Sequence, residues 1–422
     1  MYLSSDDAIF DPFMLPPYSP AGPAPLYTWE PSELERRLQY TPGNRHPRHT
    51  STFMRKCGPV AMLLYNRDSG ESTPTYGRRD VVEGAVNIDC SARCRIQRVV
   101  VQLDARADAV STGTLAVNHV LFRESATLWS AEGRAASCCC PSLLPFALRF
   151  PTTFRDPTRN NQNVVLPPSF DTTFHSMERS LFACVQYTIT VLVSKGYTLG
   201  VFPNTKKIFV PFNFQPRSRA YQSLPPRRGA FFLDSLKSVP EEWVQFTLTV
   251  PAIERPPRAS IDVHFFIPTV KIFALRDRIP FHITLRGPGV SLRDFLVRER
   301  SGVRAVTPPP VRVHIMRQVA VEASGRRAQR STVISRLEDW CVSPLALTAA
   351  DVRDDDGELD FSGELLLRCD VSVGGFAAAG IIVQDYMVFT VASPSRPLQH
   401  VVPIRIVTDS WIDEVSFYEE WL

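Results

Sequence analysis

Apolar side chains recur at every second position in many short runs along this chain. The clearest example is the stretch 183–214, which contains two such runs separated by a short break. A period of two, with β-branched and aromatic residues on one side, is typical of a strand with one buried face. Pro211 cannot donate a hydrogen bond to a neighbouring strand, so the second run is predicted to lie at a sheet edge. The alternating apolar positions are Tyr187, Ile189, Val191, Val193, Ile208, Val210, Phe212 and Phe214.

The same period recurs before and after this stretch. Proline outnumbers glycine, 36 to 20, so the runs are short and frequently interrupted, as in β structure rather than in long helices. Further strands are predicted at 60–65, 76–88, 95–105, 128–129, 144–150, 243–250, 262–268, 279–285, 311–321, 365–373, 381–386 and 403–409.

These runs fall into two blocks, which predict an all-β chain of two tandem immunoglobulin-like β-sandwiches. The first is expected over residues 56–219 and the second over residues 239–410. Residues 220–238, which contain two prolines and two arginines, are expected to form the linker between them.

The two ends of the chain lack this period. Residues 1–55 are rich in Pro, Tyr, Ser and Arg and predict a disordered tail with one short helix within 31–40. Residues 411–422 place Trp411, Val415, Tyr418 and Leu422 at helical spacing, with acidic residues opposite. This amphipathic segment either caps the second sandwich or reaches a partner.

The order of several strand phrases resembles the arrestin-like proteins of the alpha-arrestin type found in fungi. No single phrase is specific, but the ordered set covers about residues 58–410. The phrases are Tyr-x-Ile-x-Val-x-Val and Val-Pro-Phe within 187–212, Leu-Pro-Pro-Ser-Phe at 166–170, Ile-Pro-Phe-x-Ile-x-Leu at 279–285, Val-Gly-Gly-Phe at 373–376, Val-x-Asp-Tyr at 383–386 and Pro-Ile-x-Ile-Val-Thr-Asp at 403–409.

The resemblance implies an adaptor rather than an enzyme. Such proteins bind cytosolic tails of membrane transporters or receptors and recruit a HECT-type ubiquitin ligase through its WW domains. The chain would then be cytoplasmic, with recruitment to the plasma membrane or endosomes. Relatives usually carry Pro-Pro-x-Tyr motifs after the second sandwich, whereas nothing of this kind follows Val407 here.

One match to the Leu-Pro-x-Tyr form of a WW-domain ligand lies in the N-terminal tail, at Leu15, Pro16, Pro17 and Tyr18. Consecutive prolines hold the backbone in an extended left-handed helix, so little entropy is lost on docking, and the Tyr ring fills a slot on the domain. The alternative is a chance match, because Pro- and Tyr-rich tails often contain such tetrapeptides.

Arginines cluster near the linker at Arg217, Arg219, Arg227 and Arg228, and again in a Ser/Gly loop at 326–330. Guanidinium groups pair bidentately with phosphate, so the linker cluster is a candidate contact for anionic lipid or for phosphorylated tails. The alternative is ordinary exposed charge in an Arg-rich chain. The net charge of +4 is too small to indicate nucleic-acid binding.

The sequence lacks the common motifs of catalysis. It has no His-Glu-x-x-His, no phosphate-binding Gly loop, no Gly-x-Ser-x-Gly and no Cys-x-x-Cys. His264, His282 and His314 are interpreted as solvent-facing strand residues. The acidic cluster at 354–360 lacks the ligand spacing of a helix-loop-helix calcium site, so it is interpreted as a solvated loop. We therefore expect no catalytic, cofactor or metal site. An enzyme on a β-sandwich, and a sorting or signalling scaffold of the same fold without ligase recruitment, remain as alternatives.

The nine cysteines show no spacing that predicts a disulfide framework or a zinc site. Residues 138–140 are three consecutive cysteines, which form either a Ser/Cys-rich loop or a palmitoylation site. No run of 18 apolar residues is present, so no transmembrane helix is expected. The first 20 residues contain three aspartates and no Lys or Arg, which argues against a signal peptide.

Overall fold

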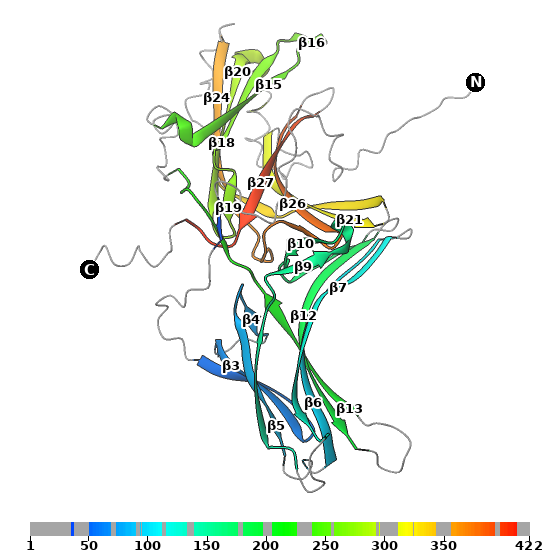
Figure 1. Cartoon of the computed structure of the whole chain (residues 1–422). Helices are drawn as coiled ribbons and strands as arrows, with labels where there is room; N and C mark the ends of the chain where they lie inside the picture. The colour runs from blue at the N-terminus through cyan, green and yellow to red at the C-terminus, as the bar shows by residue number, and fades with distance from the viewer. Residues whose placement is uncertain are drawn as a thin grey trace, which may run out of the picture.

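The computed structural model describes residues 35–37, 50–68, 73–89, 93, 95–111, 115–132, 139–175, 180–196, 205–225, 239–254, 257–292, 295, 311–323, 325–342, 356–392 and 397–411. Strand accounts for 72% of the structure and helix for 5%, which confirms the predicted all-β class. The sheets fall into two groups, one before residue 215 and one after residue 239. Figure 1 shows these groups end to end, and β7 lies against β21 where they meet.

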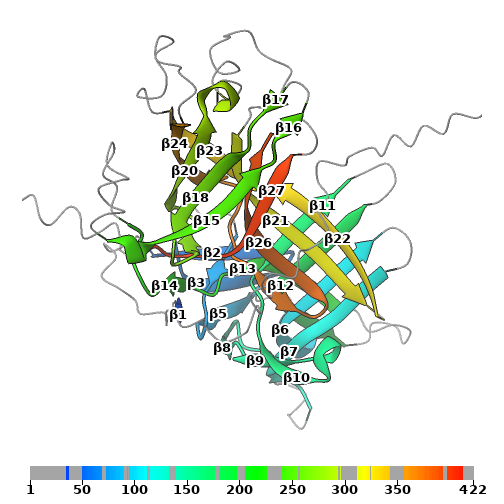
Figure 2. The ribbon, with the colours of Figure 1, turned by 90° about the horizontal axis from the view of Figure 1, so that it is seen from above.

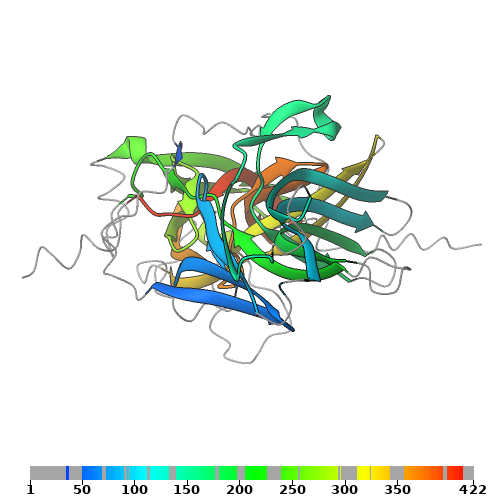
Figure 3. The same ribbon diagram turned by 60° about the horizontal axis from the view of Figure 1, so that its bottom comes forward.

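The first group forms a sandwich of two sheets. A four-stranded sheet, β2-β3-β5-β8, faces a six-stranded sheet in the order β4-β13-β12-β6-β7, to which β11 adds beside β12. The blue strands of the four-stranded sheet lie at the bottom of the view in Figure 3. The elements are β1 (Glu35–Arg37), β2 (Thr50–Cys57), β3 (Val60–Asp68), β4 (Thr75–Tyr76), β5 (Val81–Ile88), β6 (Ile96–Ser111), β7 (Leu115–Ser130), β8 (Leu143–Arg149), β9 (Thr153–Asp156), η2 (Pro157–Arg159), β10 (Gln162–Val165), β11 (Phe170–Phe174), β12 (Leu181–Lys195), β13 (Thr205–Phe214) and β14 (Ser218–Ala220).

The second group forms a sandwich of a five-stranded sheet, β15-β18-β20-β24-β23, and a six-stranded sheet in the order β19-β27-β26-β21-β22, with β25 beside β26. The elements are η3 (Pro240–Glu242), β15 (Trp243–Val250), β16 (Ile253–Glu254), β17 (Pro257–Arg258), β18 (Ile261–Pro268), β19 (Ile272–Ala274), β20 (Arg278–Pro288), β21 (Val311–Ala323), β22 (Arg326–Val333), β23 (Ser335–Val342), β24 (Asp356–Leu367), β25 (Phe376–Ala378), β26 (Ile381–Val391) and β27 (Leu398–Val407).

The long strand β12 confirms the prediction from the alternating pattern. Tyr187, Ile189 and Val191 are fully buried in the first core. The Tyr187 hydroxyl donates to the carbonyl of Pro167 at 2.6 Å, which satisfies the only polar atom of this buried side chain. Pro211 lies opposite Thr188 in β12, and β4 pairs with β13 only at residues 213 and 214. Pro211 therefore occupies the predicted edge position, where its missing N–H costs no ladder bond.

The apolar core of the first sandwich continues into the second. Val319 and Val321 of β21, together with Ile381 and Val383 of β26, belong to the same buried cluster as the first sandwich. β21 and β22 lie against β6, β7 and β12, and Figures 1 and 2 show the sheets meeting there. Because both sandwiches bury apolar surface at this junction, their relative position is fixed by packing as well as by the connecting chain.

Two segments of the predicted tail form strands instead. β1 pairs antiparallel with β14, so the helix expected within 31–40 is wrong for residues 35–37. β2 begins at Thr50 and pairs with β3, so the first sandwich takes in residues that we expected to lie outside it. In both places the strand needs a partner that is distant in sequence or lies beyond a turn, which local periodicity does not reveal.

Candidate functional site

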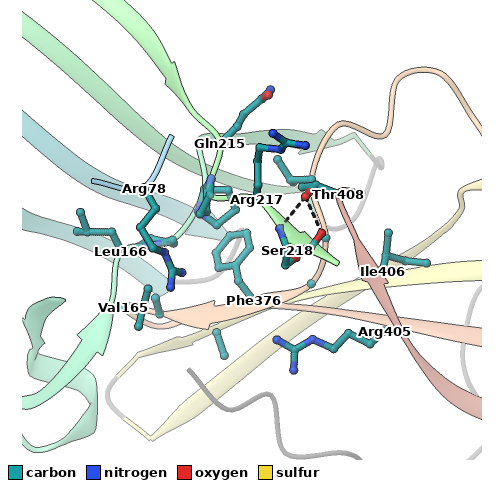
Figure 4. Close-up of a pocket in the computed structure, with 18 of the residues that line it drawn as sticks. Arg78, Val165, Leu166, Gln215, Arg217, Ser218, Phe376, Arg405, Ile406 and Thr408 are labelled. Carbon is teal, nitrogen blue, oxygen red and sulfur yellow. Dashed lines mark hydrogen bonds between the residues drawn. The ribbon is translucent and has the colours of Figure 1, made fainter. Parts of the chain in front are cut away.

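The junction between the sandwiches is built by the segment that leaves β13. After Phe214 the chain runs through residues 215–217 into β14, which lies beside the end of β27. The backbone N–H of Ser218 donates to the Thr408 hydroxyl at 2.8 Å, and the N–H of Asp409 donates to the Ser218 carbonyl at 3.0 Å. Figure 4 shows this contact, in which the connection between the sandwiches is hydrogen-bonded to the last strand of the second one.

Arg217 and Asp409 form an ion pair at the same place. The Arg217 Nε lies 3.2 and 3.1 Å from the two Asp409 carboxylate oxygens, and Nη2 also contacts Oδ1. Burial alone would raise the pKa of Asp409, but hydrogen bonds from Arg217 and Thr408 and the charges of Arg217 and Arg219 lower it below its ordinary value. The carboxylate is therefore ionised at neutral pH and holds the Arg217 guanidinium in one orientation.

A second contact between the sandwiches is made by Asp156, which is fully buried. Its Oδ2 accepts from the backbone N–H of Ala379 at 2.8 Å, and its Oδ1 accepts from the N–H and the hydroxyl of Thr158. Ala379 and Gly380 both have positive φ, 51° and 78°, and form the tight turn between β25 and β26. One carboxylate of the first sandwich thus holds a hairpin turn of the second.

A cavity of about 120 Å³ lies between these two contacts. The first sandwich contributes Arg78, from the turn after β4, and residues 164–168. The connection contributes residues 215–218, and the second sandwich contributes residues 372–378, 405, 406 and 408. Arg78, Arg217 and Arg405 all line it, whereas none of the described lining residues is Asp or Glu (Figure 4). The lining therefore carries positive charge from three separate parts of the chain.

A second cavity of about 350 Å³ lies next to the first, and both include Ser372 and Val373 in their walls. Arg317 lines it but is committed to a buried ion pair with Asp385, with Nε to Oδ1 at 2.7 Å and Nη2 to Oδ2 at 3.0 Å. The Arg317 Nη2 also donates to the carbonyl of Val373 at 2.9 Å. This pair positions the wall that separates the two cavities.

The structure describes only some of the site residues that were predicted from the sequence. Leu15, Pro16, Tyr18, Arg227 and Arg228 lie outside the described residues. Arg217 and Arg219 lie half-buried at the junction. Arg78 and Arg405, which sequence reasoning missed, join Arg217 at the cavity. No sequence signal could have found them, because Arg78 and Arg405 lie far from Arg217 and from each other along the chain.

His282 does not face solvent as we predicted from the strand pattern, since only 4% of it is exposed. Its Nδ1 lies 2.7 Å from the Ser362 hydroxyl, and its Nε2 lies 3.2 Å from both the Thr284 hydroxyl and an Asp360 oxygen. His282 faces Ser362, and Thr284 faces Asp360, across β20 and β24. The register of two neighbouring strands therefore creates this network, and it joins them on the face opposite the core.

Cysteine usage differs from the sequence prediction at one position. Cys139 is disulfide-bonded, although the spacing of the cysteines predicted no disulfide. Cys57, Cys140, Cys184 and Cys369 are free thiols. Burial raises the pKa of both Cys140 and Cys184 to about 11, so neither is a thiolate at neutral pH.

The described residues contain no group of three or more His, Cys, Asp or Glu side chains placed to hold a metal ion. In the same part of the chain, no helix is long and apolar enough to cross a membrane. No protein-family model matches the sequence, and no curated protein matches it either.

Proposed function

We propose that this chain is an arrestin-like adaptor. It links cytosolic regions of membrane transporters or receptors to a ubiquitin ligase or to the endocytic machinery, and its action is to bridge partners rather than to catalyse a reaction. The observation that carries the proposal is the agreement between the sequence phrases and the strands of the structure. Most of the strand phrases that resemble the family fall, in order, on β12, β13, β20, β26 and β27 of a molecule with two β-sandwich groups joined near residues 215–240, and the phrases at 166–170 and 373–376 lie mainly in the connections between strands.

Bridging works through effective concentration. A partner held by the sandwiches and a ligase held by the tail meet at a local concentration set by the length of chain between the two sites. In this proposal Leu15, Pro16 and Tyr18 hold a WW domain of the ligase, and the sandwiches hold the tail of the membrane protein. The arginines near the connection add contacts to anionic lipid where the adaptor is recruited to a membrane.

A comparison of partners in living cells tests this function. We expect proximity labelling with the full chain to recover a HECT-type ligase and membrane transporters or receptors, and we expect Tyr18→Ala to remove only the ligase. Tyr40→Ala is the matched control, because it removes a tail tyrosine that lies outside the Leu-Pro-x-Tyr motif. A titration of a peptide spanning residues 11–22 against WW domains of the ligase, with and without Tyr18→Ala, checks the contact directly.

One feature favours a second candidate, a sorting or signalling scaffold of the same fold. The motif occurs once and precedes the sandwiches, whereas relatives carry such motifs after them. A scaffold would recover coat or signalling proteins without the ligase, and Tyr18→Ala would then leave the partner set unchanged. Recovery of neither membrane proteins nor trafficking proteins would contradict both candidates.

A further inference from the structure

We propose that the end of the first sandwich farthest from the second one docks on an anionic membrane surface. This inference does not depend on the adaptor function, and the surface is separate from the arginines near the connection. It rests on the charge of the side chains at this end, on their lack of ion pairs and on the apolar side chains beside them.

Strand ends from both sheets of the first sandwich meet at this end. The chain turns at Gly58 between β2 and β3, while β12 ends at Lys195 and β13 begins at Thr205. The Lys206 Nζ lies 2.9 Å from the position that a Cβ atom on Gly58 would occupy, so this side chain reaches from the six-stranded sheet to the four-stranded one. Figure 1 shows this end at the bottom of the view, opposite the second sandwich.

The described residues at this end are strongly basic, and four of the six lysines of the chain lie there. Each Lys or Arg near an anionic membrane surface strengthens binding roughly fivefold. We call these cations the basic tip, which comprises Arg55, Lys56, Arg93, Arg95, Arg98, Lys195, Lys206 and Lys207. The carboxylates beside it, Asp89 and Glu132, offset only part of this charge.

The cations of the basic tip have no ion-pair partners within the part of the chain that the structure describes. Every ion pair there joins residues outside the tip. Most of the tip side chains are exposed, namely Arg55, Lys56, Arg95, Arg98 and Lys207. Exposed cations that are not committed to a carboxylate retain their attraction for an anionic surface.

Large apolar side chains lie beside the basic tip and favour lipid over a purely charged partner. Leu143 at the start of β8 is 50% exposed, Met54 on β2 is 62% exposed and Phe209 on β13 is 42% exposed. The Lys207 Nζ lies 5.7 Å from the centre of the Phe209 ring, so charge and ring share one surface. Such apolar side chains leave water when they enter the interfacial region of a bilayer, which an acidic peptide does not offer.

The sequence that connects β12 to β13 has the same character. Residues 197–204 lie outside the described residues, but the chain leaves β12 and enters β13 at this end of the sandwich. Their sequence contains Tyr, Leu, Val and Phe and no charged residue, and it is preceded by Lys195 and followed by Lys206 and Lys207. This combination of apolar and cationic residues is the one by which peripheral proteins bind anionic lipid.

Co-sedimentation of the full chain with vesicles tests the proposal. We expect binding to vesicles of phosphatidylcholine and phosphatidylserine in a ratio of about two to one, no binding to phosphatidylcholine alone, and loss of binding at high salt. The double variant Lys206→Gln with Lys207→Gln should lower the partition coefficient at least tenfold, because it removes two charges from the basic tip. Phe209→Gln should weaken binding without changing its salt dependence, because the charge stays the same.

The matched control is the double variant Arg326→Gln with Arg327→Gln, which removes the same charge from exposed positions on β22 of the second sandwich. We expect it to bind the vesicles as the unsubstituted chain does. Lys206→Arg with Lys207→Arg keeps the charge of the tip and should also bind normally. Equal weakening in the β22 control would overturn the proposal, since that result indicates a response to net charge alone.

Denaturant midpoints measured without vesicles show whether each variant is folded. If the lysine double variant unfolds, Arg55→Gln with Lys56→Gln replaces it, because both side chains are exposed members of the tip on β2. The absence of binding to anionic vesicles would overturn the proposal. Binding to polyglutamate but not to vesicles would overturn it as well, and would assign the basic tip to an acidic protein partner.

Discussion

The ion pair between Arg317 and Asp385 is buried in the second sandwich, where stability depends on both partners being present. Arg317 is 5% exposed and Asp385 is 0% exposed. Removal of one partner leaves a charge without compensation in the interior, which costs about 3–5 kcal/mol. We therefore expect Asp385→Asn and Arg317→Met each to lower the free energy of unfolding by about this amount in chemical denaturation.

The double variant Arg317→Met with Asp385→Leu should cost much less than the sum of the single variants, because no charge is then left buried. Arg368→Ala is the matched control, since Arg368 forms an exposed pair with Asp370 at 2.7 Å. Such surface pairs contribute about 0–1 kcal/mol. Equal effects in Arg317→Met and Arg368→Ala would contradict this account of the buried pair.

The half-buried imidazole of His314, which does not simply face solvent as the strand pattern predicted, should make stability fall on acidification. Burial, assisted by the charge of Arg312, lowers the pKa of His314 to about 4, against about 6.5 in an unfolded chain. Between these values the unfolded state binds a proton that the folded state does not. The stabilisation is therefore fully present above about pH 6.5 and is lost as the pH falls towards 4.

His400 acts in the same direction, because burial and the charge of Lys271 lower its pKa as well. We expect His314→Gln to show a smaller loss of unfolding free energy between pH 7 and pH 4.5 than the unsubstituted chain. Denaturant titrations at a series of pH values measure this slope. Identical slopes would show that His314 does not contribute.

Sequence periodicity could identify single apolar residues of the core but not the polar residues of the junction. The alternating positions of β12 follow from a local period, and they are buried as predicted. Arg217 and Asp409 are 192 residues apart, and Asp156 and Ala379 are 223 apart. These contacts form only when the two sandwiches pack together, so no local sequence pattern predicts them.

At the scale of elements, the short strand β1 is held to the connection by a weak pairing. It contributes only three residues, which pair with residues 218–220 of β14. β14 also bonds to the end of β27, so β1 adds a third segment to the junction.

Deletion of residues 34–38 should therefore loosen β14 more than its neighbours. We expect amide hydrogen exchange at Arg219, the middle residue of β14, to become at least tenfold faster, because an edge strand that loses its partner exposes its backbone groups. Exchange at Ser218, whose N–H donates to Thr408, and in β13, whose main partner is β12, should not change. Unchanged exchange at Arg219 would show that β1 does not protect β14.

Elements with their own alternating pattern could be predicted, and elements defined by a partner could not. β12, β13, β20 and β26 lie where the sequence predicted strands. β7 runs over Leu115–Ser130, but only its end at residues 128–129 was predicted, because charged and small residues interrupt the pattern along the rest. Its 16 residues form a strand because β6 supplies a continuous antiparallel partner.

At the scale of the whole molecule, the two sandwiches share one apolar core. Val319, Val321, Ile381 and Val383 belong to the second sandwich by topology, yet they are buried with the first. Separation would expose these side chains to water at a cost of roughly 1.5–3 kcal/mol for each large aliphatic residue. We infer that the junction behaves as part of the interior and that the sandwiches unfold together.

The buried carboxylate of Asp156 gives a test of this shared junction. Asp156→Ala leaves the buried N–H of Ala379 without its acceptor, which costs about 1–3 kcal/mol, whereas the N–H of Thr158, an exposed residue, can bond to water instead. Thr158→Val is the control, because it removes only the hydroxyl bond within the first sandwich and keeps the Asp156–Ala379 contact. We expect Asp156→Ala, but not Thr158→Val, to accelerate amide exchange at Ala379 and to lower the denaturation midpoint of both sandwiches together. If the two sandwiches share a core, amide exchange in β7 and in β26 rises in parallel as denaturant is added. A denaturation midpoint that changes in one sandwich alone would show that the two sandwiches unfold independently.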